Sequence, residues 1–82
     1  MKFSQIYDLS TTNVADFEVQ GVFCDSRKVV KNSVFVCIVG VQTDGHLFAK
    51  QAKESGAAVI FCEKDLGLDN QIVVEDTKAV YS

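Results

Sequence analysis

Residues 24–56 read CDSRKVVKNSVFVCIVGVQTDGHLFAKQAKESG, and this stretch decides the fold. It opens with a polar cluster, Cys24-Asp25-Ser26-Arg27, that follows a strand-like run. A second polar cluster, residues 40–46, follows the most apolar run of the chain and leads into an amphipathic helix. If the two runs are neighbours in a sheet, both clusters emerge at adjacent strand ends, where open α/β sheets bind small molecules.

A strand–helix–strand unit accounts for residues 34–62. Residues 34–39 are apolar throughout and end at Gly40, which is typical of a strand buried on both faces. Asp44 is a good N-cap for a helix that ends at Ser55-Gly56, and the apolar run 57–62 follows at once. The helix is expected to place Phe48 and Ala52 on one face with Leu47 beside them. The two strands should therefore be parallel and connected right-handedly.

The flanking segments supply further elements. The residues around Phe3, Ile6 and Tyr7 predict a short amphipathic helix, and residues 17–24 predict a strand kinked at Gly21. A short strand over residues 71–75 follows, and Asp76-Thr77 then resembles a helix start. We expect a small three-layer α/β domain with a mixed, partly parallel sheet built around a right-handed βαβ unit. Because so short a helix is marginal alone, the chain is expected to be a piece of a larger protein.

Length, composition and net charge limit the classes of protein to which the chain can belong. The chain of 82 residues is long enough for one domain and one core, burying about 60% of its unfolded surface. With 48% hydrophobic and 23% charged residues it resembles a globular protein, and its net charge of −3 argues against binding nucleic acid. The sequence shows no signal peptide and no apolar run near the ~20 residues that cross a bilayer, so we expect a cytoplasmic protein without membrane insertion.

Three cysteines, Cys24, Cys37 and Cys62, lie in strand-like runs without C-x-x-C spacing. Buried reduced thiols are the expected state, which favours a reducing compartment. With a single histidine, His46, the irregular spacing does not predict a zinc site, so no metal ligand is assigned.

Catalytic motifs are missing from the sequence: it has no phosphate-binding loop, no G-x-G-x-x-G and no nucleophile elbow. His46 would need a nucleophile and an orienting partner to act as a general base, so a structural or ligand-facing role is favoured. Asp25 and Asp44 are interpreted as turn or cap residues. No catalytic residue is assigned.

The sequence favours ligand binding over catalysis as the function of this domain. The Ser26 hydroxyl, at a strand end, can donate to and accept from a ligand, and Gln42 and Thr43 precede a helix N-terminus that favours acceptor-rich groups. An ordinary turn at Ser26 and an ordinary loop at residues 42–43 explain the same residues about equally well.

The motifs together resemble the N-terminal domain of the Mur ligases, most closely the MurE type that adds the third amino acid of the peptidoglycan stem. The resemblance is strong over residues 22–63 and weak to Asp76-Thr77, and it rests on the combination of motifs. Those motifs are Asp25-Ser26-Arg27, Phe35-Val36-Cys37-Ile38-Val39-Gly40, Asp44-Gly45-His46-Leu47-Phe48, Ala52, Gly56-Ala57 and Glu63. One departure is Lys31-Asn32-Ser33, where the resemblance leads one to expect a Pro-Gly-Asp-like or Gly-containing turn.

The resemblance implies a single domain, residues 1–82, that binds the UDP end of UDP-N-acetylmuramoyl-dipeptide. The contacts it implies come from Cys24, Ser26, Val41, Gln42 and Thr43, with Cys24 and Val41 acting through backbone or packing. It also implies downstream domains of the same chain that use ATP and Mg²⁺, whereas this domain needs no cofactor and is itself inactive. A MurF-type domain, a stand-alone nucleotide- or protein-binding module, and a purely structural domain remain alternatives.

Overall fold

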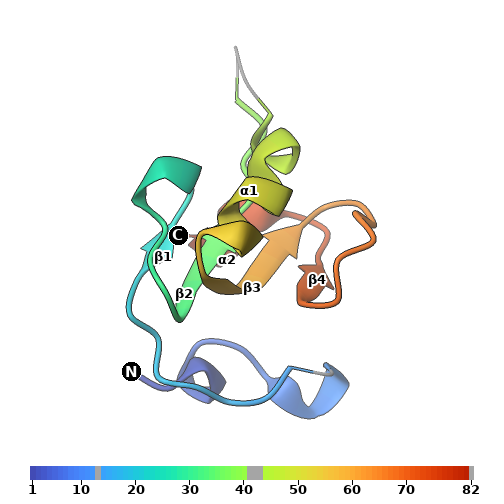
Figure 1. Cartoon of the computed structure of the whole chain (residues 1–82). Coiled ribbons are helices and arrows are strands. Elements are labelled where there is room, and N and C mark those ends of the chain that lie inside the picture. Colours follow the sequence, from blue (N-terminus) through green and yellow to red (C-terminus); the bar gives the residue numbers. More distant parts are fainter. Residues whose placement is uncertain (13, 41–43, 82) are drawn as a thin grey trace.

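A computed structural model of the chain describes residues 1–12, 14–40 and 44–81. Four strands form one sheet in the order β1-β2-β3-β4, and every neighbouring pair is parallel (Figure 1). The strands are β1 (Val22–Phe23), β2 (Ser33–Val36), β3 (Ala57–Cys62) and β4 (Gln71–Val73), and the α-helices are α1 (Ala49–Glu54) and α2 (Thr77–Tyr81). The predicted α/β class is confirmed, and the strands are parallel throughout rather than partly so.

The sheet separates two apolar cores, because successive side chains of a strand point to opposite faces. On one face Phe35 and Ile60 pack with Ala49 and Ala52 of α1. The other face carries a second cluster, which comprises Phe3, Val34, Val36, Val59, Phe61 and Ile72, with Val80 of α2 packed against it. The continuous apolar runs of β2 and β3 are therefore buried on both faces, as their sequences predict.

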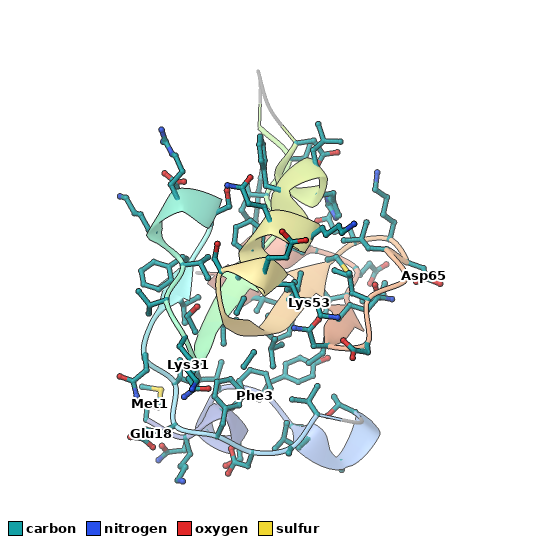
Figure 2. The ribbon with its side chains drawn as sticks, viewed as in Figure 1. Met1, Phe3, Glu18, Lys31, Lys53 and Asp65 are labelled. Atoms are coloured by element: carbon teal, nitrogen blue, oxygen red, sulfur yellow. The ribbon has the colours of Figure 1, made fainter. Side chains whose placement is uncertain are left out.

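The N-terminal segment covers the second face of the sheet. It contains two short 3₁₀ turns, Phe3–Gln5 and Leu9–Thr11, in place of the predicted amphipathic helix. Phe3 is fully buried, and its ring lies 6.0 Å from that of Phe61, between the segment and the sheet (Figure 2). The apolar spacing of Phe3, Ile6 and Tyr7 corresponds to a face that packs against the sheet, and the helical turn there is of the 3₁₀ type.

The strand predicted for residues 17–24 is only partly present. Phe17 and Val19 are half-buried and Glu18 is exposed, so the alternation is real. However, their backbone bonds go to the N-terminal segment: the Phe3 N–H donates to the Phe17 carbonyl, and the Val19 N–H donates to the Met1 carbonyl. Only Val22–Phe23 joins the sheet, as β1.

Two tight connections fix the ends of the β2–α1–β3 unit. Asn32 takes a left-handed φ of 63° before β2, a conformation that Asn adopts more readily than most other non-glycine residues. Gly56 has a φ of 118° between α1 and β3, and a Cβ there would lie 2.8 Å from Lys31 Cα. The Asn32 N–H donates to the Gly56 carbonyl, so a hydrogen bond joins the two connections.

The helix expected from Asp44 begins with a 3₁₀ turn, Gly45–Phe48, and continues as α1. The change of helical pitch rotates the buried face, so Ala49 and Ala52 are buried while Leu47 is 76% exposed. The placement of Leu47 beside the buried face was therefore wrong. Within the described ranges, no helix combines the length and apolar character needed to cross a membrane.

Candidate functional site

The first wall of the candidate site follows β1. Asp25 caps a 3₁₀ turn, Ser26–Lys28, by accepting the Arg27 N–H at 2.9 Å, and its second oxygen pairs with the Arg27 guanidinium at 2.9 Å. These bonds lower the pKa of Asp25 to about 2. Ser26 is only 8% exposed, and its hydroxyl has no hydrogen-bond partner among the described residues.

The second wall is formed by residues that follow β2 and residues that precede α1. Val39 and Asp44 form an antiparallel bridge, and the Gly45 N–H donates to the Ile38 carbonyl at 2.8 Å. A Cβ on Gly45 would lie 2.7 Å from the Ile38 nitrogen, so only glycine allows this close approach. Asp44 and Gly45 are therefore held tightly against the residues that follow β2.

A pocket of about 510 Å³ lies between these walls, at the carboxyl ends of β1 and β2. Its position is the one at which open parallel sheets bind ligands. The described residues that line it are Cys24, Asp25, Ser26, Arg27, Ile38, Gly45, Phe48 and Gln51.

The structure brings two of the predicted site residues, Cys24 and Ser26, into this one pocket. The other three, Val41, Gln42 and Thr43, lie outside the described residues, although the flanking Ile38 and Gly45 line the pocket. Arg27, Phe48 and Gln51 were not predicted. Arg27 could have been found as the neighbour of Ser26, and Phe48 and Gln51 from their spacing of three residues near the helix start.

His46 is a structural residue and not a free base. It is buried, its Nδ1 lies 2.6 Å from Asp44 Oδ1, and its Nε2 accepts the Glu63 N–H at 2.9 Å. Because Nε2 is an acceptor, the ring is neutral and carries its proton on Nδ1. Both nitrogens are thus used, which agrees with the structural role favoured by the sequence. Asp44 also caps the turn, and the His46 bonds lower its pKa.

The bonds from His46 continue across the carboxyl edge of the sheet. The Glu63 carboxylate accepts the Thr77 N–H at 2.9 Å, which lowers the pKa of Glu63. The Thr77 hydroxyl donates to the Cys37 carbonyl at 2.6 Å, and Thr77 is fully buried. This edge network, Cys37, Asp44, His46, Glu63 and Thr77, joins the ends of β2 and β3 to the start of α2. Sequence reasoning missed it.

Metal binding finds no support in the part of the chain that the structure describes: no three His, Cys, Asp or Glu residues there are grouped to hold an ion.

Fold and pocket together define a small parallel α/β domain with a candidate ligand site at the carboxyl edge of its sheet. The chain belongs to the Mur ligase family: the family profile described as "Mur ligase family, catalytic domain" matches residues 18–82.

Relatives of known function support this assignment. Over 65 residues, covering 76% of the chain, it is 48% identical to the UDP-N-acetylmuramoyl-L-alanyl-D-glutamate–2,6-diaminopimelate ligase of Alkaliphilus metalliredigens. The chain spans 13% of the length of that relative.

Two solved structures share the fold. A structure of a UDP-N-acetylmuramoyl-L-alanyl-D-glutamate–2,6-diaminopimelate ligase matches with a TM-score of 0.74 and 25% identity, covering 90% of this chain and 16% of that one. The MurF ligase of Thermotoga maritima, solved in complex with ADP, matches with a TM-score of 0.67 and 32% identity. That match covers 72% of this chain and 14% of the MurF chain.

Proposed function

We propose that this chain is the N-terminal, UDP-binding domain of a MurE-type ligase of peptidoglycan precursor synthesis. The observation that carries the proposal is Ser26, a residue only 8% exposed that lines the pocket at the carboxyl edge of the sheet and whose hydroxyl has no partner among the described residues. Among the described residues, the fully buried side-chain atoms without a partner are Ser33 Oγ and Asn70 Oδ1, so the Ser26 hydroxyl keeps access to solvent and can exchange water for a ligand.

The lining of the pocket suits a nucleoside diphosphate. Ser26 can both donate and accept, as recognition of a uracil edge requires. Phe48 presents a partly exposed ring against which a planar base can stack. Arg27 is the cation among the described lining residues; its guanidinium is paired with Asp25, and the N–H groups that this pair leaves free can bond a diphosphate. Gln42 and Thr43 would add hydrogen bonds, and Cys24 and Val41 would contribute backbone groups or packing.

The chemistry of the parent enzyme lies outside this domain. We place ATP and Mg²⁺ in the downstream domains, where ATP activates the D-glutamyl carboxyl group of UDP-N-acetylmuramoyl-dipeptide for attack by an incoming amino group. Residues 1–82 form a single domain that holds the nucleotide end of that substrate, in the cytoplasm, and forms no peptide bond itself.

The test is a titration of the chain with UDP, followed through backbone amide chemical shifts. We expect shifts at Ser26 and Gly45, on the two walls of the pocket. Ser26→Ala should weaken binding about three- to tenfold, because one hydrogen bond is lost. Ser55→Ala, an exposed serine at the end of α1, is the matched control and should bind normally. An absence of shifts at the pocket would refute UDP binding and leave a structural or partner-binding module.

A MurF-type parent enzyme is the second candidate, because the Thermotoga maritima MurF structure shares the fold at 32% identity. Assay of the full gene product separates the two. A MurE-type enzyme adds one amino acid to the dipeptide substrate, whereas a MurF-type enzyme adds a dipeptide to the tripeptide substrate.

A further inference from the structure

Cys24 is an exposed free thiol at the candidate site. Cys24 lines the same pocket as Ser26, which follows it by two residues in the sequence. The burial expected for all three cysteines is wrong for Cys24, because the strand ends at Phe23 and leaves Cys24 outside the sheet.

The other two thiols are protected by the fold. Cys37 and Cys62 are fully buried in the core beneath α1. Burial raises the pKa of Cys37 to about 12 and also raises the pKa of Cys62. Because the thiolate is the reactive form, neither can compete with an exposed cysteine for an electrophile.

The surroundings of Cys24 provide space and polar contacts for an attached group. The pocket measures about 510 Å³, which is within the range of small-molecule sites. Ser26 and Arg27 both line it, and the Ser26 hydroxyl has no partner among the described residues. A small polar group bonded to Cys24 Sγ would therefore find hydrogen-bonding partners inside the pocket.

We infer that Cys24 is a thiol–disulfide exchange site for low-molecular-weight disulfides, and that the attached half occupies the pocket. The Cys24 thiolate, having lost its proton to solvent, attacks one sulfur of the disulfide. A new S–S bond forms at Cys24, the original S–S bond breaks, and the second half leaves as a thiolate. Excess thiol reverses the step. The exchange reaction does not depend on the proposed function. The expectation that the attached group competes with UDP for the pocket rests on the proposed function.

The first experiment uses 5,5′-dithiobis(2-nitrobenzoate), an aromatic disulfide whose leaving thiolate is coloured. The folded chain should release one equivalent rapidly, and the guanidinium-unfolded chain should release three. Folded Cys24→Ser should release none in the rapid phase. Rapid release of three equivalents by the folded chain, or a rapid phase that survives in Cys24→Ser, would overturn the inference.

The second experiment asks where the attached group lies. The aromatic adduct on Cys24 should shift the Ser26 and Gly45 amides. The matched control is the same adduct on Ala15→Cys in a Cys24→Ser background, because exposed Ala15 borders a different hollow beside Asn32 and Asn70. The control adduct should leave both amides unchanged. Equal shifts in the two adducts, or none in either, would rule out occupation of the pocket.

Competition with UDP separates the two proposals. If UDP shifts the Ser26 amide in the unmodified chain but not in the Cys24 adduct, the adduct and the nucleotide share the pocket. If UDP binds both forms equally, occupation of the pocket by the adduct is wrong. If UDP binds neither form, the proposed function fails, while the release and amide measurements still decide the exchange site.

Discussion

His46 joins two segments that are distant in the sequence. One ring nitrogen contacts the Asp44 carboxylate in the turn before α1, and the other accepts a backbone N–H from Glu63 after β3. The Glu63 N–H is only partly open to water, and the imidazole supplies its acceptor. The residue most easily mistaken for a catalytic base is thus required by the fold.

Replacing His46 with Ala should lower the free energy of unfolding by about 1–3 kcal/mol, because a buried ring is removed and the partly buried Glu63 N–H loses its acceptor. His46→Gln is the matched variant: its side-chain oxygen can accept from that N–H but makes no bond to Asp44, so it should recover part of the loss. Urea unfolding followed by circular dichroism measures both. Equal stability of the Ala variant and the natural chain would contradict the role assigned to this ring.

Local bonds could be predicted from the sequence and distant ones could not. Asp44 was identified as a cap because its acceptor reaches an N–H two residues away. The bond between Thr77 and the Cys37 carbonyl depends on the whole sheet, so no short pattern encodes it. The ligand role of Ser26, and those of Val41, Gln42 and Thr43, stay predictions that the titration must test.

Uninterrupted apolar runs were the most informative signal for predicting where strands begin and end. The expected strand 57–62 coincides with β3, because a strand buried on both faces has no polar residue to obscure its limits. The expected strand 17–24 contributes only β1, because alternation specifies a half-buried extended segment but not its partner. Here that partner is the N-terminal segment.

Two glycines with positive φ offer a matched comparison. Gly67 has a φ of 74° with open space around it, so Gly67→Ala should cost only the conformational strain, about 1–2 kcal/mol. In Gly56→Ala the added Cβ would also meet the Lys31 backbone, so the loss should exceed that of Gly67→Ala by about 1–3 kcal/mol. Thermal unfolding of both variants measures the difference. The reverse order would show that the α1–β3 connection is not tightly packed.

Acid sensitivity is a property of the whole molecule, because carboxylates accept hydrogen bonds throughout it. Such bonds lower the pKa of Asp16 in the N-terminal segment, of Asp25 at the pocket, of Glu63 in the edge network and of Asp65 before β4. A carboxyl group whose pKa is lower in the folded state stabilises that state while it is ionised.

The free energy of unfolding should therefore be highest above about pH 4.5 and should fall as the pH drops through the lowered pKa values toward about 2. Glu63→Gln removes one titrating group of the edge network. The free energy of unfolding of this variant should therefore change less steeply with pH over that range than that of the natural chain. Chemical denaturation at a series of pH values measures both slopes. Identical slopes would show that the bond from Thr77 to Glu63 does not depend on the charge.

The all-parallel sheet also constrains how the chain can fold as it is synthesised. No two of its strands form a hairpin, and Val34 of β2 must find Val59 of β3 across the whole of α1. Contacts between distant residues form only after a long loop has closed, which slows folding. While the ribosome is still making α1, β2 therefore has no partner on its β3 side, and its apolar surface stays open to chaperones until Cys62 has left the exit tunnel.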